Sequence, residues 1–192
     1  MKQTAIFIVG DSGAGKSFLV AKALEDPELE TSIHVVPRCT TRRPRTIETN
    51  PEENAFLDEN EFQRSRSSFS YVWWKEIPGG HGAWYAFRRT ETKKKILVYP
   101  ANLQFLQTAW ETISPGEQGD SVILRVDASL ETRRARILQR DSVSHEELNA
   151  RLLGPPEASL LLTPHVVLRN DICYEETALF VFLTLMKGLL YA

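Results

Sequence analysis

The sequence predicts an α/β protein built on a doubly wound, five-stranded parallel sheet. Short apolar runs of strand length alternate with segments of helical periodicity, which is the pattern of repeated β-α units. The runs are apolar throughout, as expected for strands that are covered on both faces. The five predicted strands are Ala5–Val9, Ser32–Pro37, Lys95–Tyr99, Ser121–Val126 and His165–Leu168.

Most of these strands lead into a helical segment. FLVAKALED follows the first, NLQFLQTAWETI the third, ETRRARILQRD the fourth, and an apolar C-terminal segment the fifth. The second strand is followed instead by residues 38–89, which are rich in arginine and aromatic residues. A segment of this length is too long for a plain connection, so we expect an inserted subdomain there.

Length and charge limit the classes of function. A chain of 192 residues suffices for one domain, and its net charge of -2 lacks the basic excess of a nucleic-acid-binding protein. The apolar stretch of residues 177–192 is interrupted by Lys187 and is short for a membrane span. With no signal-peptide pattern, we expect a cytoplasmic protein without nucleic-acid or membrane partners. The C-terminal stripe serves the core first and a dimer interface second, so a monomer or a homodimer is expected.

A glycine-rich motif follows the first predicted strand. Residues 10–17 read GDSGAGKS and match G-x-x-x-x-G-K-[ST], in which glycines let backbone N–H groups turn around phosphate oxygens at a helix N-terminus. The alternative, a glycine turn with a helix-capping serine, is disfavoured by the strand-loop-helix context. The motif predicts an ATP site made of Gly10, Asp11, Ser12, Gly13, Ala14, Gly15, Lys16 and Ser17.

The same motif predicts the catalytic cation and the metal ligand. Lys16 is expected to reach the β- and γ-phosphates, and Ser17 to bind Mg²⁺. No N-K-x-D motif and no hydrophobic strand ending in an acidic pair are present; Ser121–Val126 is followed by a single aspartate, Asp127. We therefore expect Mg²⁺ to be held mainly by Ser17, phosphates and water.

Four arginines in RCTTRRPR, residues 38–45, follow the second strand. Guanidinium groups pair bidentately with phosphate, so this cluster favours a phosphorylated acceptor over a solvated basic loop. We expect the second strand to lie next to the strand before the phosphate loop, where an open sheet binds its ligands.

The motifs together resemble the guanylate kinase family over nearly the whole chain. GDSGAGKS, TTRRPR, ENAFLDENEF, the WYA of GGHGAWYA, ARILQRD, EELNARL and VVLRND carry the resemblance. It implies that the acceptor's phosphate is bound by Arg42, Arg45 and Tyr85. It also implies lid arginines at Arg136, Arg140 and Arg151, of which Arg136 and Arg140 act in catalysis with Lys16, and it places Asn170 near the adenine of ATP.

The residues with which guanylate kinases recognise guanine are replaced. Arg38 stands where a small hydroxyl residue is usual, Asn54 replaces a tyrosine, Trp73 replaces a glutamate, and residues 97–102, LVYPAN, replace an acidic strand end. These departures resemble the ribose 1,5-bisphosphate phosphokinase family of phosphonate degradation, which has arginine and asparagine at the positions of Arg38 and Asn54. They imply that both residues bind a bisphosphorylated sugar. Ala86, where both families usually have glycine, and the retained Arg45 depart from that second pattern.

The resemblance implies that residues 1–192 form one kinase domain with three parts. Its core comprises residues 1–37, 93–128 and 155–192, its acceptor-binding subdomain residues 38–92, and its lid residues 129–154. The leading hypothesis is transfer of a phosphoryl group from ATP to ribose 1,5-bisphosphate, giving phosphoribosyl diphosphate. The alternatives are a guanylate or other nucleoside monophosphate kinase, and a non-catalytic guanylate-kinase-like binding module.

Overall fold

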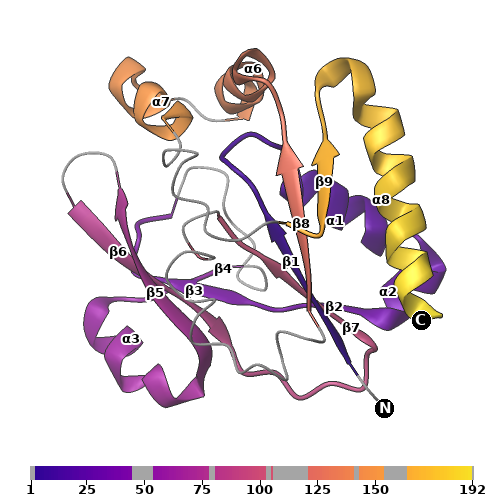
Figure 1. Cartoon of the computed structure of the whole chain (residues 1–192). Coiled ribbons are helices and arrows are strands. Elements are labelled where there is room, and N and C mark those ends of the chain that lie inside the picture. Colours follow the sequence, from indigo (N-terminus) through magenta and orange to yellow (C-terminus); the bar gives the residue numbers. More distant parts are fainter. Residues whose placement is uncertain are drawn as a thin grey trace.

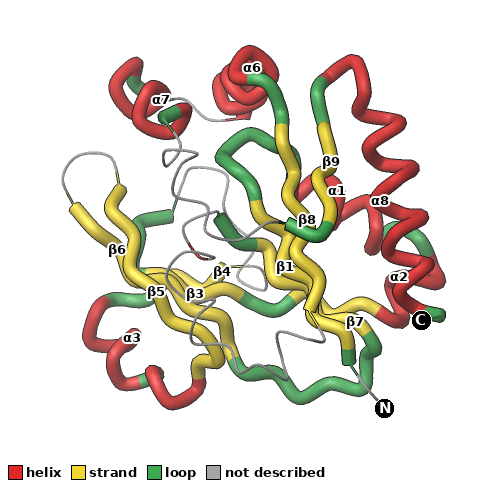
Figure 2. Tube along the Cα trace, in the orientation of Figure 1, coloured by secondary structure: helices red, strands yellow, loops and turns green. Residues whose placement is uncertain are grey.

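Five parallel strands form the central sheet of this computed structural model, which describes residues 3–44, 54–77, 81–102, 105, 121–140, 143–153 and 164–191. The strands are β1 (Thr4–Val9), β2 (Ile33–Val35), β7 (Ile96–Pro100), β8 (Ser121–Asp127) and β9 (Val166–Arg169). They lie in the order β2-β7-β1-β8-β9, and every neighbouring pair is parallel (Figures 1 and 2). The predicted fold class and its five strands are confirmed, with strand ends shifted by a residue or two.

One expectation about the sheet is wrong. We expected the second strand to neighbour the strand before the phosphate loop, but β7 lies between β2 and β1. Strands that follow each other in sequence are often neighbours in space, yet the long segment after β2 lets a later strand take the central place. The arginine cluster therefore starts from the edge of the central sheet.

Three helices cover one face of this sheet: α1 (Lys16–Leu24), α2 (Pro27–Ser32) and α8 (Glu175–Leu190). Their apolar side chains, including Leu19, Leu29 and Phe182, are buried against Ile6 and Ile8 of β1. This core fixes the start of α1, and therefore the phosphate loop, relative to the central strand.

The residues that follow β2 and precede β7 in the sequence form a second sheet. Its strands are β4 (Asn54–Phe56), β3 (Arg38–Thr40), β6 (His81–Arg88) and β5 (Phe69–Ile77), in that spatial order. The pair β3–β4 is parallel, and the pairs β3–β6 and β5–β6 are antiparallel. Helix α3 (Glu59–Arg64), capped by Asp58 and Glu61, and the short helix η1 (Arg66–Ser68) precede β5.

The two faces of the second sheet have different partners. Trp73, Tyr85 and Phe87 share a buried aromatic cluster with Phe7 and Tyr99 of the central sheet. The opposite face contributes side chains to a smaller core around α3, made of Cys39, Phe62, Phe69 and Ala86. The alternation of side chains along β6 therefore gives one face to the central sheet and one to α3.

Two helices follow β8: α6 (Leu130–Arg140) and α7 (His145–Leu152). A short helix η4 (Ile172–Tyr174) connects β9 to α8. None of the helices that the structure describes has the length and hydrophobicity of a membrane span.

Candidate active site

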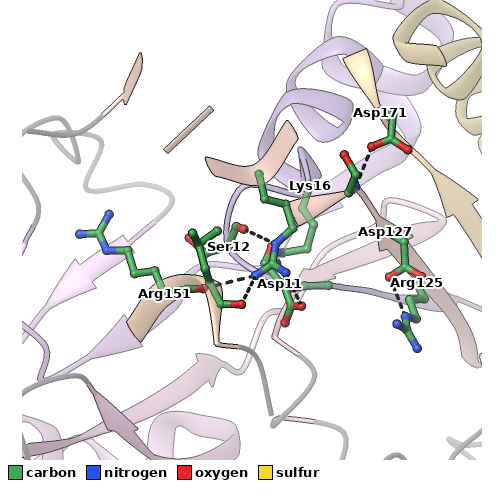
Figure 3. A network of polar contacts seen from close by, with 11 residues as sticks. Asp11, Ser12, Lys16, Arg125, Asp127, Arg151 and Asp171 are labelled. Carbon is green, nitrogen blue, oxygen red and sulfur yellow. Dashed lines mark hydrogen bonds and ion pairs between the residues drawn. The ribbon is translucent and has the colours of Figure 1, made fainter. Parts of the chain in front are cut away.

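The phosphate loop connects β1 to α1, as the motif predicts. Residues 10–15 form this loop, and Lys16 is the first residue of α1. The Lys16 Nζ donates hydrogen bonds to the carbonyl oxygens of Gly10, at 2.7 Å, and Asp11, at 3.0 Å (Figure 3). The ammonium group is therefore held inside the loop, where a bound triphosphate would replace these carbonyls.

Gly15 at the N-terminus of α1 cannot be replaced without disturbing the loop. Its φ of 96° lies in the left-handed region, which favours glycine. A Cβ atom there would lie 2.2 Å from the Nδ2 atom of Asn170, a residue that is fully buried. The motif's glycine thus serves both the turn into the helix and the close approach of the segment after β9.

The outer side of the phosphate loop is bound by side chains from two other segments. The Ser12 carbonyl accepts a hydrogen bond from Arg133 at 3.0 Å. The Gly13 and Ala14 carbonyls each accept one from Arg136 at 3.4 Å. Asn170 also donates to the Ala14 carbonyl, at 2.9 Å. In a trans peptide the C=O and the following N–H point in opposite directions. Binding the Ser12 and Ala14 carbonyls from outside therefore turns the N–H groups of Gly13 and Gly15 away from these side chains, while the Ala14 N–H donates to the Asp11 carbonyl within the loop at 3.3 Å.

Magnesium fits the donors that are present. Ser17 lies in the first turn of α1 with its side chain exposed, next to Lys16. Among the described residues no group of three or more His, Cys, Asp or Glu side chains could hold a metal ion. One hydroxyl suits Mg²⁺, which keeps several waters and takes its other ligands from substrate phosphates.

The predicted lid arginines lie in three different surroundings. Arg136 is half-buried and also donates to the Asn170 carbonyl at 2.8 Å, so its guanidinium faces the loop's backbone. Arg140 is exposed at the last position of α6. Arg151, in the last turn of α7, forms an ion pair with Glu147. The contacts of these residues with transferring phosphates stay predictions.

Asn170 is placed by the end of β9 next to the phosphate loop. Its backbone N–H donates to the Asp127 carbonyl at 2.7 Å, and its side chain binds the loop as described above. Its Oδ1 atom is buried without a hydrogen-bond partner. The structure thus gives Asn170 a contact with the loop, and its predicted closeness to adenine stays a prediction.

Three of the predicted acceptor residues lie on the same face of the second sheet. Arg38 pairs in register with Asn54 and with Phe87, and Thr40 pairs with Tyr85, which places these side chains on the face toward the central sheet. Arg38 binds the Asn54 Oδ1 through Nε, at 2.9 Å, and a terminal nitrogen, at 2.5 Å. The predicted roles of these two residues in binding the acceptor stay predictions.

Tyr85 and Arg42 both contact aromatic rings. Tyr85 is buried and stacks on Trp73, with ring centroids 5.4 Å apart. The Arg42 guanidinium lies over the Phe56 ring, 5.3 Å from its centroid, and donates to the Arg43 carbonyl at 2.7 Å. Arg45 lies outside the residues that the structure describes.

Comparison with known proteins identifies relatives of this chain. No protein-family model matches it. A guanylate kinase of Aromatoleum aromaticum is 32% identical over 158 residues, which are 80% of this chain and 73% of that protein. A guanylate kinase of Rubrobacter xylanophilus is 33% identical over 149 residues, which are 77% and 74% of the two chains. The chain belongs to the guanylate kinase family.

A solved structure supports the fold of this guanylate kinase family member. The crystal structure of guanylate kinase from Anaplasma phagocytophilum covers 97% of this chain and 87% of its own, with a TM-score of 0.58 and 20% sequence identity. The resemblance to guanylate kinases drawn from the motifs is confirmed. The narrower resemblance to ribose 1,5-bisphosphate phosphokinases stays a prediction.

The sequence analysis missed two residues that organise the site of this family member. Arg133 is buried and contacts the phosphate loop, although only Arg136 and Arg140 were assigned in that arginine-rich segment. Their spacing was a usable signal, because residues three apart lie on one face of a helix. Asp171, the second missed residue, follows Asn170 and accepts hydrogen bonds from the Ser129 N–H, at 2.6 Å, and from Arg169, at 2.7 Å.

The contacts of Asp171 lead us to expect that it makes the protein's stability depend on pH. The hydrogen bond from Arg169, followed by that from Ser129, holds the pKa of Asp171 well below its ordinary 3.8. A depressed carboxyl pKa contributes stability that is present above the unfolded-state pKa and is lost as pH falls through the folded-state pKa.

We expect Asp171→Asn to lower the urea midpoint at neutral pH and to flatten the loss of stability below about pH 4. Urea unfolding from pH 7 to pH 2 checks this, with Glu131→Gln, at an exposed position of α6, as a control for the lost charge. An unchanged slope below pH 4 contradicts the role of Asp171.

Proposed function

We propose that this protein is an ATP-dependent phosphotransferase of the nucleoside monophosphate kinase type, acting on an acceptor that already carries a phosphate. The observation that carries the proposal is the phosphate loop itself. It joins a central strand to a helix, has Lys16 and Ser17 at the start of that helix, and has its carbonyls bound from outside. The rival hypothesis of a non-catalytic binding module is disfavoured by this intact loop.

The mechanism follows from charge placement. Lys16 exchanges its contacts with the Gly10 and Asp11 carbonyls for the β- and γ-phosphates of ATP. Ser17, together with phosphates and water, would hold Mg²⁺, which would supply further neutralisation of the phosphate charge. Arg140, exposed at the end of α6, approaches the transferred group, while Arg136 keeps the loop in shape. An acceptor phosphate is already ionised near neutral pH, so the reaction requires no general base.

The relatives favour a nucleoside monophosphate as acceptor. Proteins named guanylate kinase match most of this chain, and GMP is therefore the first acceptor to test. Arg42 and Tyr85 are the residues proposed to bind its phosphate, together with Arg45. Arginine suits this task because its planar fork matches the geometry of a phosphate group.

A second candidate acceptor is a sugar that carries two phosphates and no base, as in ribose 1,5-bisphosphate. The contact that favours it is the pair Arg38–Asn54, which puts a permanent cation where guanylate kinases contact the base. Trp73, at the position of their guanine-binding glutamate, is buried in the aromatic cluster and offers no carboxylate. A cation faces a second phosphate better than a neutral purine.

The acceptor is tested by comparing kcat/KM for GMP and for ribose 1,5-bisphosphate in an ATP-coupled assay. Transfer to either compound supports the phosphotransferase, and the larger value identifies the acceptor class. If the sugar is the acceptor, we expect Arg38→Ser to lower its kcat/KM by about 10- to 100-fold, the effect of losing a charge-assisted hydrogen bond. If GMP is the acceptor, the same variant should leave or improve its use. No ADP formation with any nucleoside monophosphate or sugar phosphate contradicts the proposed function.

A further inference from the structure

Arg133 of α6 is a buried cation with a carboxylate partner in the phosphate loop. Its exposed fraction is 8%, and its NH1 lies 3.1 Å from the Asp11 Oδ2. Removing a guanidinium from water is costly unless the charge is paired and its N–H groups are hydrogen-bonded. Asp11 supplies the countercharge, so the two residues act as one unit beside the loop.

The same guanidinium binds the loop's backbone. Its Nε donates to the Ser12 carbonyl at 3.0 Å. The two backbones also touch, because a Cβ on Gly13, whose φ is 82°, would lie 2.7 Å from the Arg133 carbonyl oxygen. Side chain and main chain of α6 thus both hold the turn of residues 11–13. With the Ser12 carbonyl bound on this side, the following N–H points to the anion-binding side.

The remaining contacts of Arg133 reach α7. Its NH2 lies 3.3 Å from the carbonyl oxygens of both Arg151 and Leu152, in the last turn of that helix. The last four carbonyls of a helix have no N–H group four residues further on in that helix, and the negative end of a helix dipole favours a cation. Figure 3 shows the backbone of Arg151 beside Asp11 and Ser12 of the loop. One side chain therefore connects three segments: the phosphate loop, α6 and α7.

We propose that Arg133, paired with Asp11, is a positioning residue that couples the phosphate loop to α7, so that binding of a triphosphate in the loop orders α7. The proposal rests on the ATP binding proposed above. Phosphate oxygens that bind the loop's N–H groups fix its carbonyls, and fixed carbonyls at residues 11–13 fix the guanidinium that holds α7. Because coupling between two sites is reciprocal, an α7 docked on Arg133 also favours the loop shape that binds ATP.

Hydrogen–deuterium exchange of the α7 amides, with and without saturating ATP and Mg²⁺, tests the coupling. In the unaltered protein we expect ATP to slow exchange of α7 about tenfold, within the usual range for coupled sites. Arg133→Lys keeps the charge for Asp11 but cannot reach the loop and both α7 carbonyls at once. We expect this variant and Arg133→Gln to bind ATP about tenfold more weakly. At saturation they should show protection of α1 without protection of α7.

Further variants separate positioning from general destabilisation. Arg134→Gln removes an exposed arginine from the next position of α6 and should behave as the unaltered protein. Asp11→Asn should weaken ATP binding, and in a double variant with Arg133→Gln the two effects should be less than additive.

The outcomes are distinguishable. Protection of α7 by ATP in Arg133→Gln equal to that in the unaltered protein overturns the proposal, as does ATP binding by the unaltered protein without any protection of α7. Failure of the unaltered protein to bind ATP at all rejects the proposed function, and the coupling with it.

Discussion

Replacing Lys16 with alanine is expected to lower kcat for phosphoryl transfer by about 10²- to 10³-fold or more, because the transition state loses a cation that stabilises its developing charge. The fold should remain intact. The Lys16 ammonium donates to the Gly10 and Asp11 carbonyls of the loop, and its side chain is half-buried there and does not belong to the apolar core. Steady-state assays with ATP and the acceptor identified above measure the loss, and circular dichroism and thermal melting verify folding.

A second lysine on the same helix provides the matched control. Lys22 is exposed and pairs with Glu25 at 2.7 Å, away from the loop. Lys22→Ala removes the same charge from α1 and should leave turnover unchanged, since exposed ion pairs contribute little to stability. Near-normal turnover of Lys16→Ala would remove the phosphate loop from the mechanism.

The central sheet could be predicted because its signals are local. Each strand is a short apolar run, and the loop motif fixes where the first strand ends and the first helix begins. The second sheet could not be predicted in the same way. Strands β3 and β4 have three residues each, and they exist only through pairing with segments far away in sequence. The position of β2 at the sheet edge is also a tertiary property, which explains the wrong neighbour for the strand before the loop.

The same distinction between local signals and tertiary contacts applies to the candidate active site. The motif located Lys16, Ser17 and the loop glycines, because chemistry restricts residue types at those positions. Arg133 pairs with the Asp11 carboxylate and also binds three backbone carbonyls. Since a carbonyl is present at every residue, no sequence pattern reveals which of them it binds. The catalytic role of Arg136 was drawn from the resemblance and stays a prediction; in the structure its guanidinium binds the carbonyls of Gly13 and Ala14.

The contact between the two sheets depends on one aromatic cluster. Trp73 is 2% exposed and lies 4.8 Å from Phe105, 5.3 Å from Phe87 and 5.4 Å from Tyr85, measured between ring centroids. The cluster continues to Phe7 of β1. Tyr85, a predicted acceptor residue, therefore depends for its position on the ring of Trp73.

We expect Trp73→Ala to lower the free energy of unfolding by about 3–5 kcal/mol, the usual effect of deleting a large buried aromatic side chain. The indole Nε1 is buried without a hydrogen-bond partner, so removal of the ring costs packing and no polar contact. Trp73→Phe keeps part of the ring volume and should lose less. Trp73→Glu, which places the glutamate of guanylate kinases at this position, should destabilise at least as much as alanine, because the carboxylate enters an apolar cluster.

Urea unfolding measures the loss of stability in all three Trp73 variants. Trp74→Ala on the opposite face, at a position 43% exposed, is the control and should cost far less. A loss below about 1 kcal/mol for Trp73→Ala contradicts the role of this cluster in joining the two sheets.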